Sequence, residues 1–205
     1  MQGKSRPCQR GFLHVCANMR RRLPHRHLSE TQPMGDPLPS QGTSIMTIDE
    51  FRDCLLDYYQ TEVRGEAFFA ATLSKFDAPD HAYKLGSLLQ LETETKARLR
   101  PTILELGGSV EELESSRSAG LSRAASISAG DWEGFVRVLN KVGEPLTNRQ
   151  REVSEIAPQP YRELALSMKI HGESIQDFTD RELAGDSAHS IDSVVLQLKF
   201  PLRRS

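Results

Sequence analysis

Apolar residues recur with a helical period along most of the chain after residue 46. The period is clear in four segments, at about 48–76, 82–106, 131–156 and 161–183. Proline or glycine follows each segment and marks its end: Pro79, Gly107 with Gly108, Pro158 and Gly185. At a rise of about 1.5 Å per residue, the first two helices would each be roughly 37–43 Å long. The pattern therefore predicts four helices in an elongated bundle.

The first of these helices has a strong start signal. Thr47 is a good N-cap residue, and Glu50 stands three positions later, at the spacing of a capping box. Met46 directly precedes it. We expect the folded bundle to span residues 46–205.

The connections between the four segments differ in character. Residues 109–130 are mostly small and polar, which predicts a long crossover with room for one short helix. Gly143 and Pro145 lie inside the third segment and predict a kink or break there. Residues 190–200 are expected to form a short helix or turn across one end. Two hairpins joined by a long crossover are a standard wiring of a four-helix bundle, so the predicted fold is an all-α four-helix bundle with a long crossover between helices 2 and 3.

The first 45 residues differ from the rest in charge. They carry seven basic and two acidic side chains and lack the continuous apolar segment of a secretory signal. They are expected to form a disordered basic N-terminal extension. One alternative is that Met34 or Met46 is the true start and the upstream residues are an artefact of gene calling. Another is an organelle transit peptide, although Pro7, Gly11 and Pro24 interrupt any amphipathic helix.

Composition excludes several classes of partner. Residues 46–205 carry 19 basic and 26 acidic side chains, a poor match for phosphate, so nucleic-acid binding is not expected. No apolar run reaches the length of about 18 residues that a membrane span requires. The three cysteines are odd in number and indicate a reducing compartment, so a cytoplasmic location is predicted.

Polar residues interrupt the apolar face near the middle of three predicted helices. Positions seven residues apart return to nearly the same helix face. On such series Glu62, Glu92 and His171 each stand among apolar residues: Leu55, Phe69 and Phe76; Leu85, Leu99 and Leu106; Leu164 and Phe178. Their similar heights predict one shared, buried polar layer.

Buried carboxylates need partners, and two arrangements would supply them. In the first, Glu62, Glu92 and His171, joined by Glu66 one turn after Glu62, hold a transition metal that neutralises the charge. In the second, Glu62, Glu92 and His171 form an ion-pair and hydrogen-bond network with Arg149 and bind no ligand. Arg149 falls on the apolar series of the third helix.

This pattern resembles the ferritin-like superfamily over about residues 46–185. In metal-loaded members, two helices each supply one Glu and the other two each supply a Glu-x-x-His pair. Glu62 matches a single-Glu position and Glu92 matches the Glu of the second helix. The chain departs from the motif at Thr95, where the family has His, and at Met168, where it has Glu. The resemblance therefore implies a member with a degenerate di-metal site.

Two functions follow from these expectations. The incomplete ligand set favours a non-catalytic bundle that acts by homo-oligomerisation or partner binding. The alternative is a metal-dependent oxidase, hydroxylase or iron-handling protein that holds iron or manganese with Glu62, Glu66, Glu92 and His171. No nucleophile motif or phosphate-binding loop supports a hydrolase or a nucleotide-binding protein.

Overall fold

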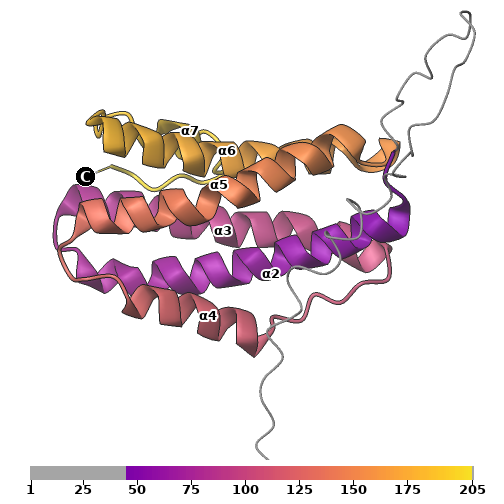
Figure 1. Ribbon diagram of the computed structural model, residues 1–205, viewed down its shortest axis with the longest axis horizontal. Coiled ribbons are helices and arrows are strands. Elements are labelled where there is room, and N and C mark those ends of the chain that lie inside the picture. The colour runs from indigo at the N-terminus through magenta and orange to yellow at the C-terminus, as the bar shows by residue number, and fades with distance from the viewer. Residues whose placement is uncertain (1–44, 205) are drawn as a thin grey trace, which may run out of the picture. The chain divides into compact units, whose positions relative to one another are not determined.

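The computed structural model describes residues 45–204, and regular structure in that range is helical throughout (Figure 1). The expected all-α class is thus confirmed. The predictions made for the basic N-terminal segment fall on residues 1–44, outside the described range. Among the described residues, no helix combines the length and apolarity needed to cross a membrane.

The first hairpin joins α2 (Ile48–Thr72) to α3 (Pro79–Glu105). The predicted capping box is present, because the Thr47 side chain accepts from the Glu50 backbone and the Glu50 carboxylate accepts from the Thr47 backbone. A 3₁₀ turn, η2 (Leu73–Lys75), ends α2. Pro79 begins α3, where its missing N–H costs nothing.

The crossover contains the one short helix that was expected, α4 (Glu114–Ala125). It lies along α2 (Figure 1), and the two backbones approach closely at Gly120. A Cβ there would overlap the Arg64 carbonyl oxygen and reach 3.0 Å from the Ala67 side chain. Only glycine permits this approach, so the crossover is fixed to the bundle rather than looping away from it.

The second hairpin joins α5 (Trp132–Ile156) to α6 (Arg162–Ala184) through the 3₁₀ turn η3 (Gln159–Tyr161). Helix α5 continues through Gly143 and Pro145, so of the predicted kink or break, the break is wrong. A proline inside a helix removes one backbone hydrogen bond. The packing of α5 against α6, together with the helical turns on either side of Pro145, stabilises the helix by more than this loss. Gly185, at a φ of 84°, ends α6 in the left-handed conformation.

The last described residues close one end of the second hairpin and run back along α3. Helix α7 (Asp192–Val195) packs on α6, which matches the short C-terminal helix or turn that was expected. The backbone N–H of Lys199 donates to Glu94 at 2.8 Å, and Gln90 donates to the Phe200 carbonyl at 2.6 Å. These contacts join the two hairpins at their edges.

The hydrophobic core is divided into two parts along the bundle. One part is built around Phe68, Phe69, Phe135 and Phe178. The other contains Phe51, Leu55, Leu99 and Met168, among others. The mid-height positions on α2, α3 and α6 separate the two parts, and these positions carry polar side chains.

Candidate metal centre

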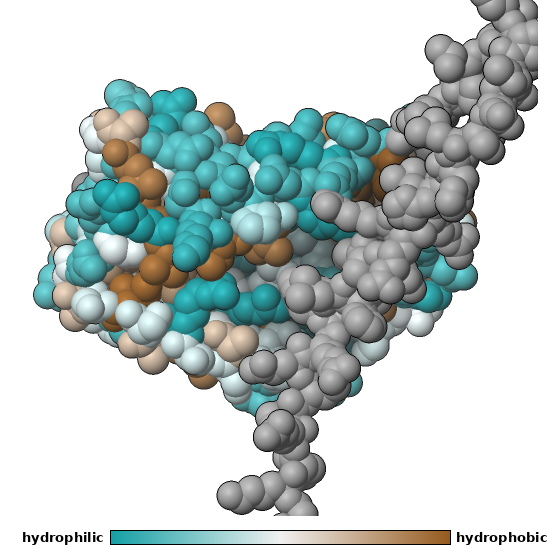
Figure 2. Space-filling view, viewed as in Figure 1, coloured by the Kyte–Doolittle hydropathy of each residue, from teal (hydrophilic) through white to brown (hydrophobic). Residues whose placement is uncertain are grey.

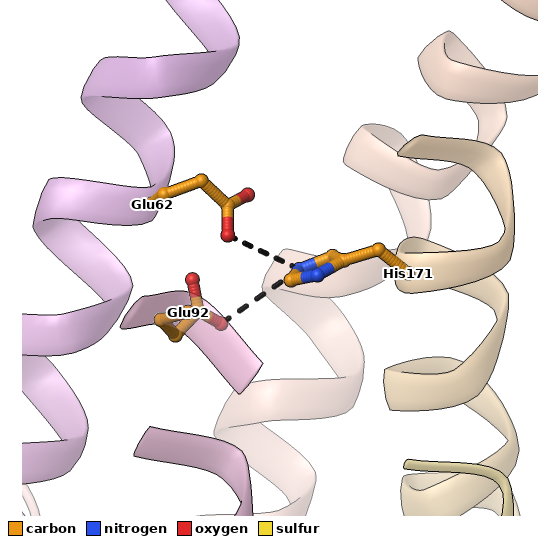
Figure 3. A group of neighbouring side chains, drawn as sticks. All are labelled: Glu62, Glu92 and His171. Atoms are coloured by element: carbon orange, nitrogen blue, oxygen red, sulfur yellow. Dashed lines mark ion pairs between the residues drawn. The ribbon is translucent and has the colours of Figure 1, made fainter. Parts of the chain in front are cut away.

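Glu62, Glu92 and His171 meet in the interior between the two hairpins. They project from α2, α3 and α6 toward a common point (Figure 3). His171 Nε2 lies 3.4 Å from Glu62 Oε2 and 3.8 Å from Glu92 Oε1. One ligand atom from each residue lies within 4.8 Å of the other two, and all three residues are at most 4% exposed. The sequence-predicted polar layer is therefore present.

A glycine on α2 provides the space for the Glu92 carboxylate. A Cβ built on Gly65 would lie 2.5 Å from Glu92 Oε2 and 2.6 Å from its carboxyl carbon. Any other residue at this position would force the carboxylate to shift. The absence of a side chain on Gly65 thus sets where Glu92 points.

Thr95 fixes the imidazole from the side opposite the carboxylates. Its Oγ1 lies 3.1 Å from His171 Nδ1 and Thr95 is buried. When Nδ1 carries the proton and donates to Thr95, the lone pair of Nε2 faces the two carboxylates. An orienting hydrogen bond on the other ring nitrogen is typical of metal-bound histidine. Thr95 occupies the position at which the resembled family has a ligand, but here it supports one instead.

The cluster holds protons when no cation is bound. Burial, the charge of Glu92 and a hydrogen bond with it raise the pKa of Glu62 well above its ordinary value. Burial raises the pKa of Glu92 to about 7. Burial and the charge of Arg98 lower the pKa of His171 to about 3, so the imidazole is neutral at pH 7. The site is therefore a proton-sharing pair of carboxyls beside a neutral ring.

Within residues 45–204, no Lys or Arg forms an ion pair with the Glu62 or Glu92 carboxylate, although the charge of the buried Lys96 acts to lower the pKa of Glu92. Arg98 lies near enough for its charge to act on Glu62 and His171, yet it forms no ion pair within 4.0 Å of a carboxylate of residues 45–204. The sequence-based network with Arg149 is wrong. That guanidinium contacts Glu152 at 3.4 Å and the Cys54 sulfur at 3.5 Å, at the edge of the bundle.

Glu66, the fourth predicted ligand, lies outside the cluster. Its carboxylate accepts from Lys96 at 2.5 Å and from Thr93 at 2.8 Å, on the outer side of α3. Its charge still contributes to the raised pKa of Glu92. Three of the four predicted residues are thus brought together, and the fourth belongs to a neighbouring ion pair.

A cavity of about 80 Å³ adjoins the cluster between α2, α5 and α6. Its wall includes Gln150 and Thr147 on α5, which the sequence analysis did not single out. Two carbonyl-type oxygens on this wall, Glu62 Oε2 and Gln150 Oε1, are buried without a hydrogen-bond partner. Buried acceptors of this kind are uncommon in proteins, and here both belong to residues that line the same cavity.

The three side chains fit a single divalent transition metal. Zinc, iron and manganese bind imidazole and carboxylate at about 2.0–2.2 Å, which places neighbouring ligand atoms roughly 3–3.5 Å apart. The two distances from His171 Nε2 are close to that range. Glu62 Oε2 would gain the partner that it lacks. Helix α5 contributes no acid, because Glu144, Glu152 and Glu155 are all exposed, so the described ligand set suits one ion rather than two.

The chain matches no family model, no curated protein and no solved structure. A role for Glu62, Glu92 and His171 is therefore argued from their geometry alone.

Proposed function

We propose that residues 46–205 form a ferritin-like bundle in which Glu62, Glu92 and His171 hold one iron or manganese ion. The supporting observation is the meeting of two carboxylates and one neutral imidazole in a buried layer, in which Glu62 Oε2 lies 3.4 Å from His171 Nε2 but accepts no hydrogen bond. A mixed set of carboxylate oxygens and imidazole nitrogen suits Fe²⁺ or Mn²⁺. The bound ion would neutralise the carboxylates and supply a redox or Lewis-acid centre.

The adjoining cavity extends the proposal to a class of activity. Three protein ligands would leave coordination positions of an ion unfilled, and all three of these residues line the cavity. We infer metal-dependent oxidation or hydroxylation of a small molecule held there. Iron storage is less consistent with the site, since only one ion is accommodated by the described ligands.

The competing function is a non-catalytic bundle that acts by homo-oligomerisation or partner binding. In that case Glu62 and Glu92 would simply share a proton, with Thr95 supporting His171. Such a layer would specify how the helices pair rather than bind an ion. The two functions differ in whether the cluster takes up metal.

Metal analysis of protein purified without chelator, followed by anaerobic titration with Fe²⁺ and Mn²⁺, separates these functions. We expect one ion per chain, and a loss of affinity of at least a hundredfold in Glu92→Ala and His171→Ala. Glu155→Gln is the matched control, because this carboxylate is exposed on α5 and lies outside the cluster. Circular dichroism of each variant checks that the helices remain. Wild-type protein that is isolated metal-free and takes up neither ion would reject the proposal.

A further inference from the structure

The cavity beside the cluster is mainly apolar along its length. Figure 2 shows a hydrophobic band between the hydrophilic surface of α5 and the paler, mixed surface of α2 with α4. The cavity in this region has a wall of large apolar side chains: Phe68, Phe69, Leu139, Val142, Leu146 and Ile175. Its volume of about 80 Å³ is smaller than that of a cavity of about 150 Å³ that binds benzene. The buried part of any ligand must therefore be small.

The two ends of the cavity carry opposite charge. Its buried end is formed by Glu62 and Glu92, which are the only acids on its wall. The wall also includes Arg64 from α2 and Arg123 from the last turn of α4, which are both partly exposed and so lie nearer to solvent than the two acids. The two guanidinium groups lie near enough for the charge of Arg123 to lower the pKa of Arg64, after the larger effect of burial.

Two neighbouring arginines at one cavity contrast with the net negative charge of the bundle. Residues 46–205 carry an excess of acidic side chains, yet two like-charged groups adjoin one opening. The guanidinium of Arg123 forms no ion pair with any residue in the range 45–204. Two arginines at one site are suited to bind a planar anion through parallel hydrogen bonds.

We propose that this cavity binds a small aliphatic carboxylate, with its anionic group at Arg64 and Arg123 and its apolar end toward Glu62, Glu92 and His171. The reverse orientation would place the ligand carboxylate against two acids in a low-dielectric interior, which is unfavourable. The wall between the two ends is apolar and matches a short hydrocarbon body.

The orientation identifies the part of the ligand that meets the ion. The carbon farthest from the carboxylate would lie next to the metal centre. This part of the proposal names the substrate class of the proposed function and rests on that function. Binding of the carboxylate itself rests only on the arginines and the apolar wall. The two proposals can therefore fail separately.

The test is calorimetric titration of the full, metal-free chain with butanoate and hexanoate, each paired with its neutral amide. We expect the carboxylates to bind at least tenfold more tightly than the amides, because the neutral group loses the charge-assisted hydrogen bonds. Arg123→Gln and Arg64→Gln should each weaken carboxylate binding at least tenfold, whereas Arg123→Lys should recover part of it. Val142→Phe should abolish binding by filling the cavity.

Arg137→Gln is the matched control, since this arginine is exposed on α5 and pairs only with Glu133. Its carboxylate affinity should equal that of the wild type. Equal binding of carboxylates and amides, no binding of either, or preference for butyl phosphate over butanoate would each overturn the proposal. So would carboxylate binding that requires added Mn²⁺ and ignores the arginine variants, because the anion would then coordinate the ion.

The metal and carboxylate experiments also distinguish the two proposals from one another. Stoichiometric metal binding without carboxylate binding would overturn the carboxylate site alone. Carboxylate binding to a chain that takes up no metal would overturn the metal centre alone and leave the anion site standing.

Discussion

Thr95 Oγ1 lies 3.1 Å from His171 Nδ1, in a buried contact between α3 and α6. A threonine hydroxyl can donate or accept, so it can support either tautomer of the ring. With a metal on Nε2, only Nδ1 can carry the ring proton, and Thr95 becomes the acceptor. The contact therefore couples the ring orientation to metal binding.

Thr95→Val tests this coupling. Valine has nearly the same shape but leaves the Nδ1 proton without a partner, so we expect metal affinity to fall by about tenfold or more. Direct titration with Mn²⁺ measures the change. Thr93→Val is the control, because Thr93 is exposed and contacts Glu66 instead. Unchanged affinity in Thr95→Val would show that Thr95 only fills space.

The stability of the metal-free protein should fall as the pH rises above about 6.5. Burial raises the pKa of Glu92 from 4.5 to about 7, so the folded state retains a proton that the unfolded state has lost. Stability from such a raised pKa decreases as the pH increases through this window. Burial lowers the pKa of His171 from 6.5 to about 3, which has the opposite effect between those two values. The two effects oppose each other between 4.5 and 6.5, and only the carboxyl effect remains above 6.5.

Chemical denaturation in the presence of chelator at pH 6.5 and pH 8 measures this difference. We expect the wild type to lose about 1–3 kcal/mol over the interval, at about 1.4 kcal/mol per pH unit for each proton retained by the folded state. Glu92→Gln should reduce the loss and be the more stable protein at pH 8. A wild-type stability that is constant or increases over this interval would contradict the buried proton.

Metal affinity should rise with pH over the same window, because the ion displaces protons from Glu62 and Glu92. Below pH 7 the proton on Glu92 alone would weaken binding about tenfold per pH unit. Histidine does not contribute, since its pKa is about 3 in the folded protein. Mn²⁺ titration at pH 6, 7 and 8, in buffers of different ionisation enthalpy, gives both affinity and proton release. An affinity independent of pH would argue against carboxylate ligation.

Gly65→Ala should impair the centre without touching a ligand. The added Cβ would lie 2.5 Å from Glu92 Oε2, so the carboxylate must move away from His171. We expect at least a tenfold loss of metal affinity while the helical content stays unchanged. Gly143→Ala is the matched control on the cavity wall, because a Cβ there meets only Gln176, at 3.8 Å. If both variants bind metal equally well, Gly65 does not position Glu92.

The polar layer could be predicted from sequence because seven-residue spacing preserves helix face over short distances. Glu62 lies one heptad from Leu55 and from Phe69, and all three are buried. The same logic failed for Glu66, four residues after Glu62. This spacing rotates the side chain by about 40°, and Lys96 on α3 offers it an ion pair outside the cluster. The spacing of residues along one helix does not show which side chain on a neighbouring helix will pair with a carboxylate.

The face of α5 was misassigned for a related reason. An α-helix drifts by about 20° per heptad relative to a strict seven-residue repeat. Two heptads after the buried Phe135, Arg149 has moved to the edge, and Gln150 is buried in its place. The cavity could not be predicted from the sequence, because its size depends on the distance between the two hairpins. The residue pattern of a single helix does not determine that distance. The family resemblance stays a prediction.

A second buried polar group, away from the metal centre, should dominate stability. Lys84 is fully buried on α3 and contacts Glu182 of α6 at 2.7 Å, while Glu182 also accepts from Trp132 at 2.7 Å. Lys84→Met would leave the Glu182 carboxylate buried and without its cation, which costs about 3–5 kcal/mol. Lys84→Met with Glu182→Leu should recover most of this loss, because no uncompensated charge remains.

Arg137→Ala, which breaks an exposed pair on α5, should change the unfolding free energy by less than about 1 kcal/mol. A single Lys84→Met variant as stable as Arg137→Ala in urea denaturation would show that this pair does not hold the two hairpins together.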